Sequence, residues 1–238
     1  MIELRIGGGL LTLRLWPTII AAGMFVTLLG LGTWQVQRLQ WKTELLATIE
    51  ARSQEEPIDV SEIKDINQVD YRPAQASGLF QYDREFYLHA ISLEGEGGYH
   101  VLTPLQLENG KYLLVDRGWV PFDKKLPATR LDGQLIGSVL VKGILRIPRS
   151  YWMQPANSSS KNDWYSIDLT AMAKMADIPE FMPFVLDADS TKNAGGYPLG
   201  GQTRKVLPNN HLSYAITWYG LALALLVIYG ISSYRKVS

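Results

Sequence analysis

The run LWPTIIAAGMFVTLLGLGTWQVQ (residues 15–37) contains no Asp, Glu, Lys, Arg or His. It exceeds the roughly 20 apolar residues that a helix needs to cross a hydrocarbon core. A second uncharged run, LSYAITWYGLALALLVIYGI, occupies residues 212–231. Trp16 and Trp34 bracket the first run, as in the aromatic belts of membrane helices. We therefore expect two transmembrane helices, one near each end of the chain.

A cleaved signal peptide is the alternative explanation for the first run. Its apolar region would be only about 7 to 15 residues long and would end in small residues at a cleavage site. The run here is longer, and Trp34 and Gln35 stand where small residues should be. These features favour an uncleaved span.

Two spans place both chain ends on one side of the membrane and everything between them on the other. The basic residues near the membrane are almost balanced between the two sides, so their charge leaves the orientation open. The predicted division is an N-terminal tail (1–14), a first span (15–37), an extramembrane domain (38–210), a second span (211–232) and a C-terminal tail (233–238).

The pattern between the spans changes from helical to β-rich. A helical pattern continues over residues 42–52 and stops before Pro57, and an acidic connector covers residues 58–70. β-rich runs predict strands at 74–80, 85–90, 99–107, 111–120, 139–147 and 181–187. Asn109-Gly110 predicts a tight hairpin turn, residues 168–176 predict a short helix, and residues 190–210 predict an extended return to the bilayer. The predicted fold class is an α+β membrane protein whose two transmembrane helices flank one β-rich domain with a short helix.

Composition removes several classes of function. The 238 residues include 23 Lys or Arg, 23 Asp or Glu and no Cys. A chain without thiols has no disulfides, thiolate metal sites, iron–sulfur clusters or covalently attached c-type haem. Zero net charge argues against an electrostatic nucleic-acid binder. Phosphate-binding loops, zinc-protease motifs and nucleophile elbows are absent from the sequence, so an enzyme is unsupported and we expect none.

Among the three histidines, His211 is the candidate for function. His89 and His100 have no companions at metal-ligand spacing, which argues against a metal site there. His211 stands at the head of the second span, where an ionisable group is costly and is a functional candidate by default. The alternative, an interfacial histidine that only contacts lipid headgroups, is about equally supported by the residues alone.

Helical spacing gathers further candidates around His211. Tyr214 and Trp218 follow it at i+3 and i+7 and so share its face of the second span. At the end of the first span, Trp34, Arg38 and Trp41 stand at i, i+4 and i+7, with Lys42 alongside. Because the spans are antiparallel, these two groups meet at the same membrane face.

This set of side chains suits a haem. A neutral imidazole is an ordinary axial ligand of haem iron, aromatic side chains suit a flat macrocycle, and Arg38 or Lys42 can pair with propionates. Taken singly, the tryptophans can be belt anchors and the two cations can contact lipid headgroups. The haem hypothesis requires the two helices to pack with these faces together.

Five motifs stand out along the chain: GLGTWQVQRLQWK (30–42), YRPAQASGLF (71–80), GYHVLTPL (98–105), LLVDRGWVP (113–121) and PNNHLSYAITWYGLA (208–222). They cover both spans and most of the intervening domain. In these motifs and in their order, the chain resembles the Surfeit locus protein 1 family.

The resemblance implies a non-enzymatic assembly factor for haem-copper cytochrome c oxidase, acting when haem a enters the catalytic subunit. It implies cytoplasmic termini with a periplasmic domain, and haem a binding through His211 as iron ligand, with Trp34, Tyr214 and Trp218 as the family's motif residues. No Arg-rich, acid-poor presequence precedes the first span, which favours a bacterial inner membrane. The expected partners are the oxidase catalytic subunit, other assembly factors, the haem a synthesis enzyme and the bilayer.

The second hypothesis is a scaffold that stabilises an oxidase subunit without binding haem. It would use the spans and the DRGWVP segment (residues 116–121). For two residues of that segment we favour ordinary strand positions, with Arg117 facing solvent and Trp119 facing the core.

Overall fold

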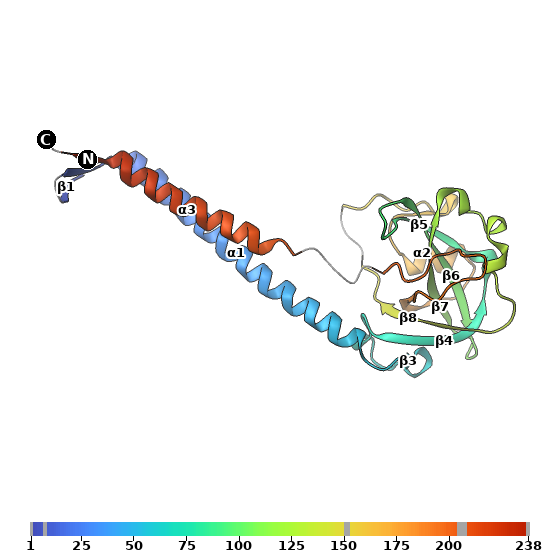
Figure 1. Cartoon of the computed structure of the whole chain (residues 1–238). Coiled ribbons are helices and arrows are strands. Elements are labelled where there is room, and N and C mark those ends of the chain that lie inside the picture. Colours follow the sequence, from blue (N-terminus) through green and yellow to red (C-terminus); the bar gives the residue numbers. More distant parts are fainter. Residues whose placement is uncertain (1, 7–8, 150–152, 204–208, 237–238) are drawn as a thin grey trace. The chain divides into compact units, whose positions relative to one another are not determined.

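The computed structural model of the chain describes residues 2–6, 9–149, 153–203 and 209–236. The chain divides into two units, Met1–Ala47 with Val206–Ser238, and Thr48–Lys205. We describe the first as the helical unit and the second as the central domain. This is the predicted fold class: two long apolar helices, one near each end of the chain, flank a β-rich domain that carries a short helix (Figure 1).

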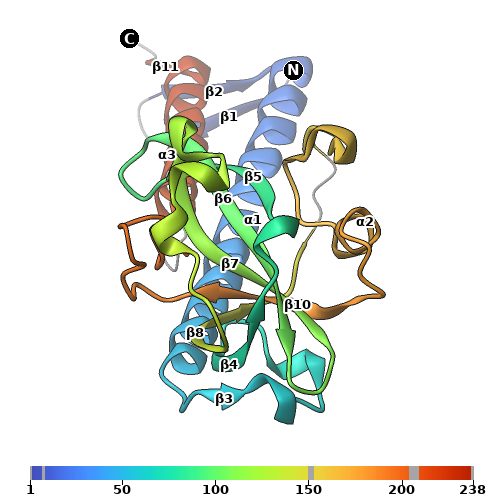
Figure 2. The same cartoon turned by 90° about the vertical axis from the view of Figure 1, so that its right-hand side faces the viewer.

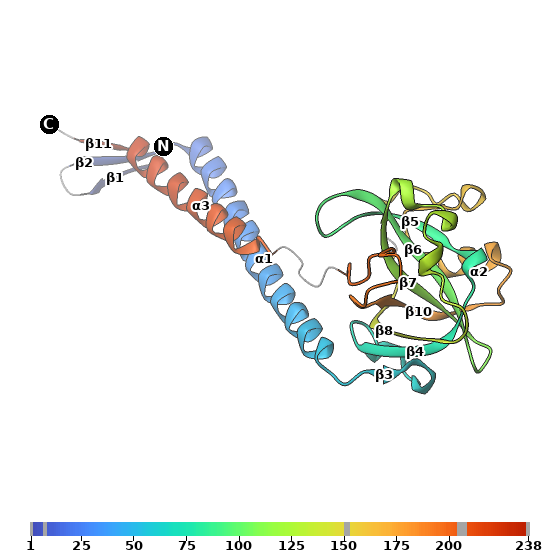
Figure 3. The same cartoon turned by 45° about the vertical axis from the view of Figure 1, so that its right-hand side comes forward.

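The helical unit is built from two antiparallel helices. Helix α1 spans Leu15–Ser53 and continues past the unit boundary without a break, and α3 spans His211–Ser233. Figures 1 and 3 show α3 lying alongside the N-terminal part of α1. Both helices are long and apolar enough to cross a membrane, and most of their apolar side chains are exposed, unlike those of a soluble core helix. The protein is therefore a membrane protein.

A small sheet at the chain ends was missed by sequence reasoning. Strands β1 (Ile2–Ile6), β2 (Gly9–Leu13) and β11 (Tyr234–Lys236) pair antiparallel in the order β1-β2-β11. The pairing of β11 with β2 joins residues more than 200 positions apart. Local periodicity carries no signal for such a long-range pairing.

The central domain contains all six predicted strands and the predicted helix. They are β4 (Pro73–Phe80), β5 (Phe86–Ile91), β6 (Gly97–Leu107), β7 (Tyr112–Pro121), β8 (Val139–Arg146), β10 (Phe181–Ala188) and α2 (Leu169–Met175). The two-residue strands β3 (Ile58–Asp59) and β9 (Asp163–Trp164) were not predicted, because they are too short to show a period. Short 3-10 helices occupy connections at Val60–Glu62, Ile66–Gln68, Tyr82–Arg84, Phe122–Lys124, Pro127–Thr129, Leu131–Gly133 and Ser159–Lys161.

The sheet closes on itself. Its order is β3-β4-β8-β10-β7-β6-β5-β9, and an additional β4–β6 pairing joins the first part to the last. Strand β4 changes partner at Gly78, which pairs with Val139 of β8 and with Leu107 of β6. A Cβ at Gly78 would lie 2.3 Å from the Gln106 carbonyl oxygen, so this closure requires glycine. The result is a small barrel.

The barrel has apolar side chains on both sides of its wall. One buried cluster, between the strands and the Val60–Glu62 turn, includes Leu105, Leu113, Val115, Leu145, Phe184 and Leu186. A second cluster packs α2 against the sheet and includes Phe86, Trp164, Met172 and Val185 (Figure 2).

Local capping agrees with the predicted elements of the domain. Asp168 caps helix α2, since its side-chain oxygen accepts the N–H of Ala171 at 3.0 Å. Gly110, with φ +78°, closes the predicted turn between β6 and β7. These contacts fix the ends of the elements that carry the buried clusters.

Candidate functional site

The two long helices contact each other through small residues and hydroxyl groups. The ring of Tyr219 lies against Gly32, where an added Cβ would come within 2.8 Å of it. The Tyr219 hydroxyl lies 3.1 Å from the hydroxyl of Thr33. Ala215 and Ala222 of α3 are buried. Small residues that let helices approach closely, together with hydrogen bonds between them, are what holds helices together in lipid.

His211 is the first residue of α3, and its imidazole is oriented by α1. Its Nδ1 lies 2.7 Å from Oε1 of Gln35, a side chain that is only 9% exposed. An amide oxygen accepts a hydrogen bond, so Nδ1 is the donor in this arrangement and Nε2 is the ring nitrogen not used by Gln35. Ligating histidines are generally held this way, with the second ring nitrogen donating to a carbonyl or carboxylate.

A cation lies between two tryptophans on α1. The guanidinium carbon of Arg38 is 5.8 Å from the ring centroid of Trp34 and 5.3 Å from that of Trp41. All three side chains are exposed. Cation–π contacts of this kind hold the guanidinium among the rings and leave the other ring faces open.

The remaining predicted residues are close in sequence to these contacts. Tyr214 is exposed, whereas Trp218 and Lys42 are partly buried. Within the described part of the chain, no hydrogen bond or ring contact joins Tyr214 or Trp218 to the tryptophans of α1. The structure therefore joins His211 to α1 through Gln35, and leaves the aromatic side chains of the two helices without direct contact.

Gln35 is the residue that sequence reasoning missed. Its signal was present, because it is an amide within an otherwise apolar span. Polar side chains inside spans are costly and usually hydrogen-bond across helices. Asn209, two positions before His211, carries a second polar group. Its Oδ1 is buried and has no hydrogen-bond partner among the described residues.

The donor set of this site fits a haem. It offers an imidazole whose Nδ1 bonds to Gln35 and whose Nε2 is not used in that bond, exposed aromatic surface and one arginine held by ring contacts. A flat apolar macrocycle with anionic propionates calls for these groups.

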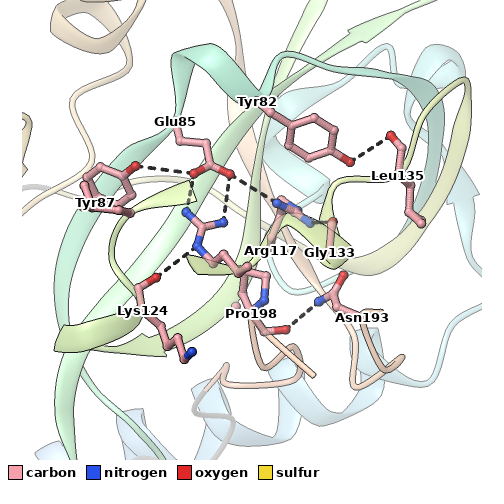
Figure 4. Close-up of polar contacts among 12 residues, drawn as sticks. Tyr82, Glu85, Tyr87, Arg117, Lys124, Gly133, Leu135, Asn193 and Pro198 are labelled. Atoms are coloured by element: carbon pink, nitrogen blue, oxygen red, sulfur yellow. Dashed lines mark hydrogen bonds and ion pairs between the residues drawn. The ribbon is translucent and has the colours of Figure 1, made fainter. Parts of the chain in front are cut away.

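The central domain contains a buried ionic cluster of its own (Figure 4). Glu85 accepts hydrogen bonds from Arg130 through both carboxylate oxygens and from Nη1 of Arg117 at 3.3 Å. Burial is the main cause that lowers the pKa of Arg117, and burial beside Glu85 raises the pKa of Tyr87 to about 12. The expectation that Arg117 faces solvent is wrong, because its side chain is buried and donates a hydrogen bond to Glu85. Trp119 is buried, as expected.

The two other histidines are paired with aspartates. Nε2 of His89 lies 2.8 Å from Oδ1 of Asp163, and Nδ1 of His100 lies 2.6 Å from Oδ2 of Asp116. Burial alone would lower the pKa of His100, but the charge and hydrogen bond of Asp116 outweigh it and raise that pKa. Both histidines therefore have a structural role as partners of buried or partly buried aspartates.

Comparison with known proteins agrees with the sequence resemblance. A model of the SURF1 family matches residues 22–223. Surfeit locus protein 1 of Mus musculus is 39% identical over 215 residues, which cover 83% of this chain and 69% of that protein. Surfeit locus protein 1 of Homo sapiens is 36% identical over 217 residues, covering 84% and 71% of the two chains. The SURF1-like protein of Drosophila melanogaster is 33% identical over 217 residues, covering 83% and 71%. This chain belongs to the SURF1 family.

Proposed function

We propose that this protein is a non-enzymatic assembly factor for haem-copper cytochrome c oxidase, and that it holds haem a for transfer to the catalytic subunit. Family membership supports the role in oxidase assembly. The observation that carries haem binding is the His211–Gln35 hydrogen bond, which uses Nδ1 and leaves Nε2 as the nitrogen for the haem iron.

The residues have distinct tasks in this proposal. His211 is the axial ligand of the haem iron, and Gln35 holds its tautomer and ring orientation. Trp34, Trp41, Tyr214 and Trp218 offer apolar surface to the macrocycle, and Arg38 and Lys42 pair with the propionates. An exposed site with one imidazole suits a cargo that must be released again.

We further propose a bacterial inner membrane location, with both termini cytoplasmic and the central domain periplasmic. The catalytic subunit, other assembly factors and the haem a synthesis enzyme are the partners that this role requires. Orientation can be tested directly, because the chain has no native cysteine to interfere with single-cysteine labelling. Ser160 of the central domain and Tyr234 of the C-terminal tail are exposed and are suitable positions on the two sides.

The test of haem binding is an absorption spectrum of the full-length protein purified after co-expression with haem a synthesis. The expected result is a Soret and an α band that His211→Ala abolishes or shifts, while the variant still inserts into the membrane. A colourless wild-type protein that still associates with the oxidase subunit would instead establish the scaffold function. An unchanged spectrum in His211→Ala would refute the ligand assignment.

A further inference from the structure

A cavity of about 350 Å³ opens beside the barrel of the central domain. Its walls come from β8, from the segment after β10, and from side chains near the end of β4. The apolar members of the lining are Phe80, Leu135, Val139, Leu140, Val141, Ala188 and Ala194. The volume lies at the lower end of the roughly 300–1,000 Å³ of small-molecule sites.

Arg117 forms part of the cavity wall, although its side chain is only 4% exposed. Its guanidinium carbon lies 5.1 Å from the ring centroid of Phe80 and 4.9 Å from that of Tyr82. One nitrogen donates to the carbonyl oxygen of Gly133, as Figure 4 shows. The cation is thus fixed at the wall by two rings and a carbonyl group.

The ionic cluster that contains Arg117 has one positive charge too many. It consists of two guanidinium groups and a single carboxylate, Glu85, with side-chain exposures of 4% (Arg117), 2% (Arg130) and 1% (Glu85). Arg130 donates hydrogen bonds to both carboxylate oxygens of Glu85, whereas Arg117 donates only one to that carboxylate, at 3.3 Å. A buried charge without a full partner is costly. An anion in the cavity would remove that cost.

The mouth of the cavity is also positive. Lys142 and Lys192 line it and are exposed. The one acidic residue of the lining, Asp189, uses Oδ1 to accept the N–H of Thr191 at 2.9 Å. The lining therefore contains three cations and one carboxylate, and most of its other side chains are apolar.

We propose that this cavity binds an aliphatic carboxylate, with the carboxylate beside Arg117 and the two lysines and the acyl chain against the apolar wall. An acyl chain needs no hydrogen bonds along its length, which suits walls made of Phe, Leu and Val side chains. An extended peptide would need a free strand edge. Strand β8 has little free edge. Strand β4 pairs along one edge of it, and β10 together with the hydrogen bond from the Asp189 N–H to the Lys142 carbonyl occupies most of the other edge.

Calorimetric titration of the full-length protein in lipid nanodiscs with octanoate tests the proposal, with empty nanodiscs as the blank. We expect saturable binding, no saturable binding of octanol, and about threefold to tenfold weaker octanoate binding in Lys142→Gln and Lys192→Gln, as expected for loss of one charged contact. Val141→Trp, which fills the cavity, should abolish binding. Lys174→Gln, an exposed lysine on α2 outside the lining, is the matched control.

Four results would overturn the proposal: no saturable octanoate binding, equal binding of octanol, equal loss in Lys174→Gln, or binding only of a peptide with an apolar C-terminal residue. The variants avoid Arg117, whose removal would disturb the buried ionic cluster. The site is independent of the proposed haem function, and His211→Ala should therefore bind octanoate as the wild type does.

Discussion

Nδ1 of His211 and Oε1 of Gln35 are 2.7 Å apart, although 176 positions separate the two residues in the chain. This hydrogen bond joins the first residue of α3 to a buried position on α1. Hydrogen bonds between helices in lipid contribute only about 0.6–2 kcal/mol each. Its main effect is therefore on the direction and tautomer of the imidazole rather than on helix pairing.

Gln35→Leu is expected to weaken haem binding without removing the ligand. Loss of a partner that orients a ligating histidine typically lowers metal affinity about 10- to 100-fold. The measurement is a haem titration of the full-length protein followed at the Soret band. Gln37→Leu, an exposed glutamine on the same helix, should bind haem as the wild type does. Equal affinity of wild type and Gln35→Leu would show that Gln35 has no part in the site.

Gly32→Val is expected to separate the long helices. A Cβ there would lie 2.8 Å from the Tyr219 ring, whereas a Cβ at Gly30 would meet nothing within 4 Å. Spin labels at Gln37→Cys and Leu212→Cys report the spacing of α1 and α3 by pulsed electron resonance. The distance distribution should broaden and move outward in Gly32→Val and stay unchanged in Gly30→Val. Identical distributions in both variants would contradict close packing at Gly32.

Most of the fold could be predicted because its signals are local. Uncharged runs marked the long helices, β-rich runs marked the six main strands, and Asn109-Gly110 marked the turn between β6 and β7. The terminal sheet could not be predicted, since its pairing of β2 with β11 depends on antiparallel helices that bring the chain ends together. The closure of the barrel at Gly78 is likewise a long-range event.

Only part of the candidate site could be predicted, for a related reason. Helical spacing placed Arg38 with Trp34 and Trp41, and the structure shows that contact. Gln35 was missed because its importance depends on the rotation of α1 relative to α3, which no single-helix pattern contains. Arg117 was assigned to solvent because strand alternation does not show that Glu85 lies across the sheet from it.

Glu85→Gln is expected to destabilise the central domain strongly. It would leave two buried guanidinium groups without their carboxylate, and breaking a buried ion pair in this way costs about 3–5 kcal/mol. The free energy of unfolding, measured by chemical denaturation of the full-length protein, checks this. Glu94→Gln replaces an exposed glutamate and should change that free energy by less than about 0.5 kcal/mol. Similar values for both variants would mean that the cluster tolerates loss of its anion.

The His100–Asp116 pair should make stability depend on pH in a definite direction. The pKa of His100 is raised above 6.5, because Asp116 outweighs the opposing effect of burial. The pKa of Asp116 is lowered below 3.8, because His100 outweighs burial there. The contribution of His100 to the free energy of unfolding is complete below pH 6.5 and is lost as the pH rises through the folded-state pKa of His100. The aspartate contribution is complete above pH 3.8 and is lost as the pH falls through its folded-state pKa.

The pair is therefore most stabilising between about pH 4 and 6.5, and replacing His100 removes this contribution. We expect the wild type to exceed His100→Gln in free energy of unfolding by the largest margin within that window, and by a shrinking margin as the pH rises above it. Urea denaturation at a series of pH values measures the margin. Lys174→Gln should follow the wild-type curve throughout. A margin that stays constant from pH 5 to pH 9 would show that the folded protein does not raise the pKa of His100, because only a proton held more tightly in the folded state makes the margin shrink as the pH rises.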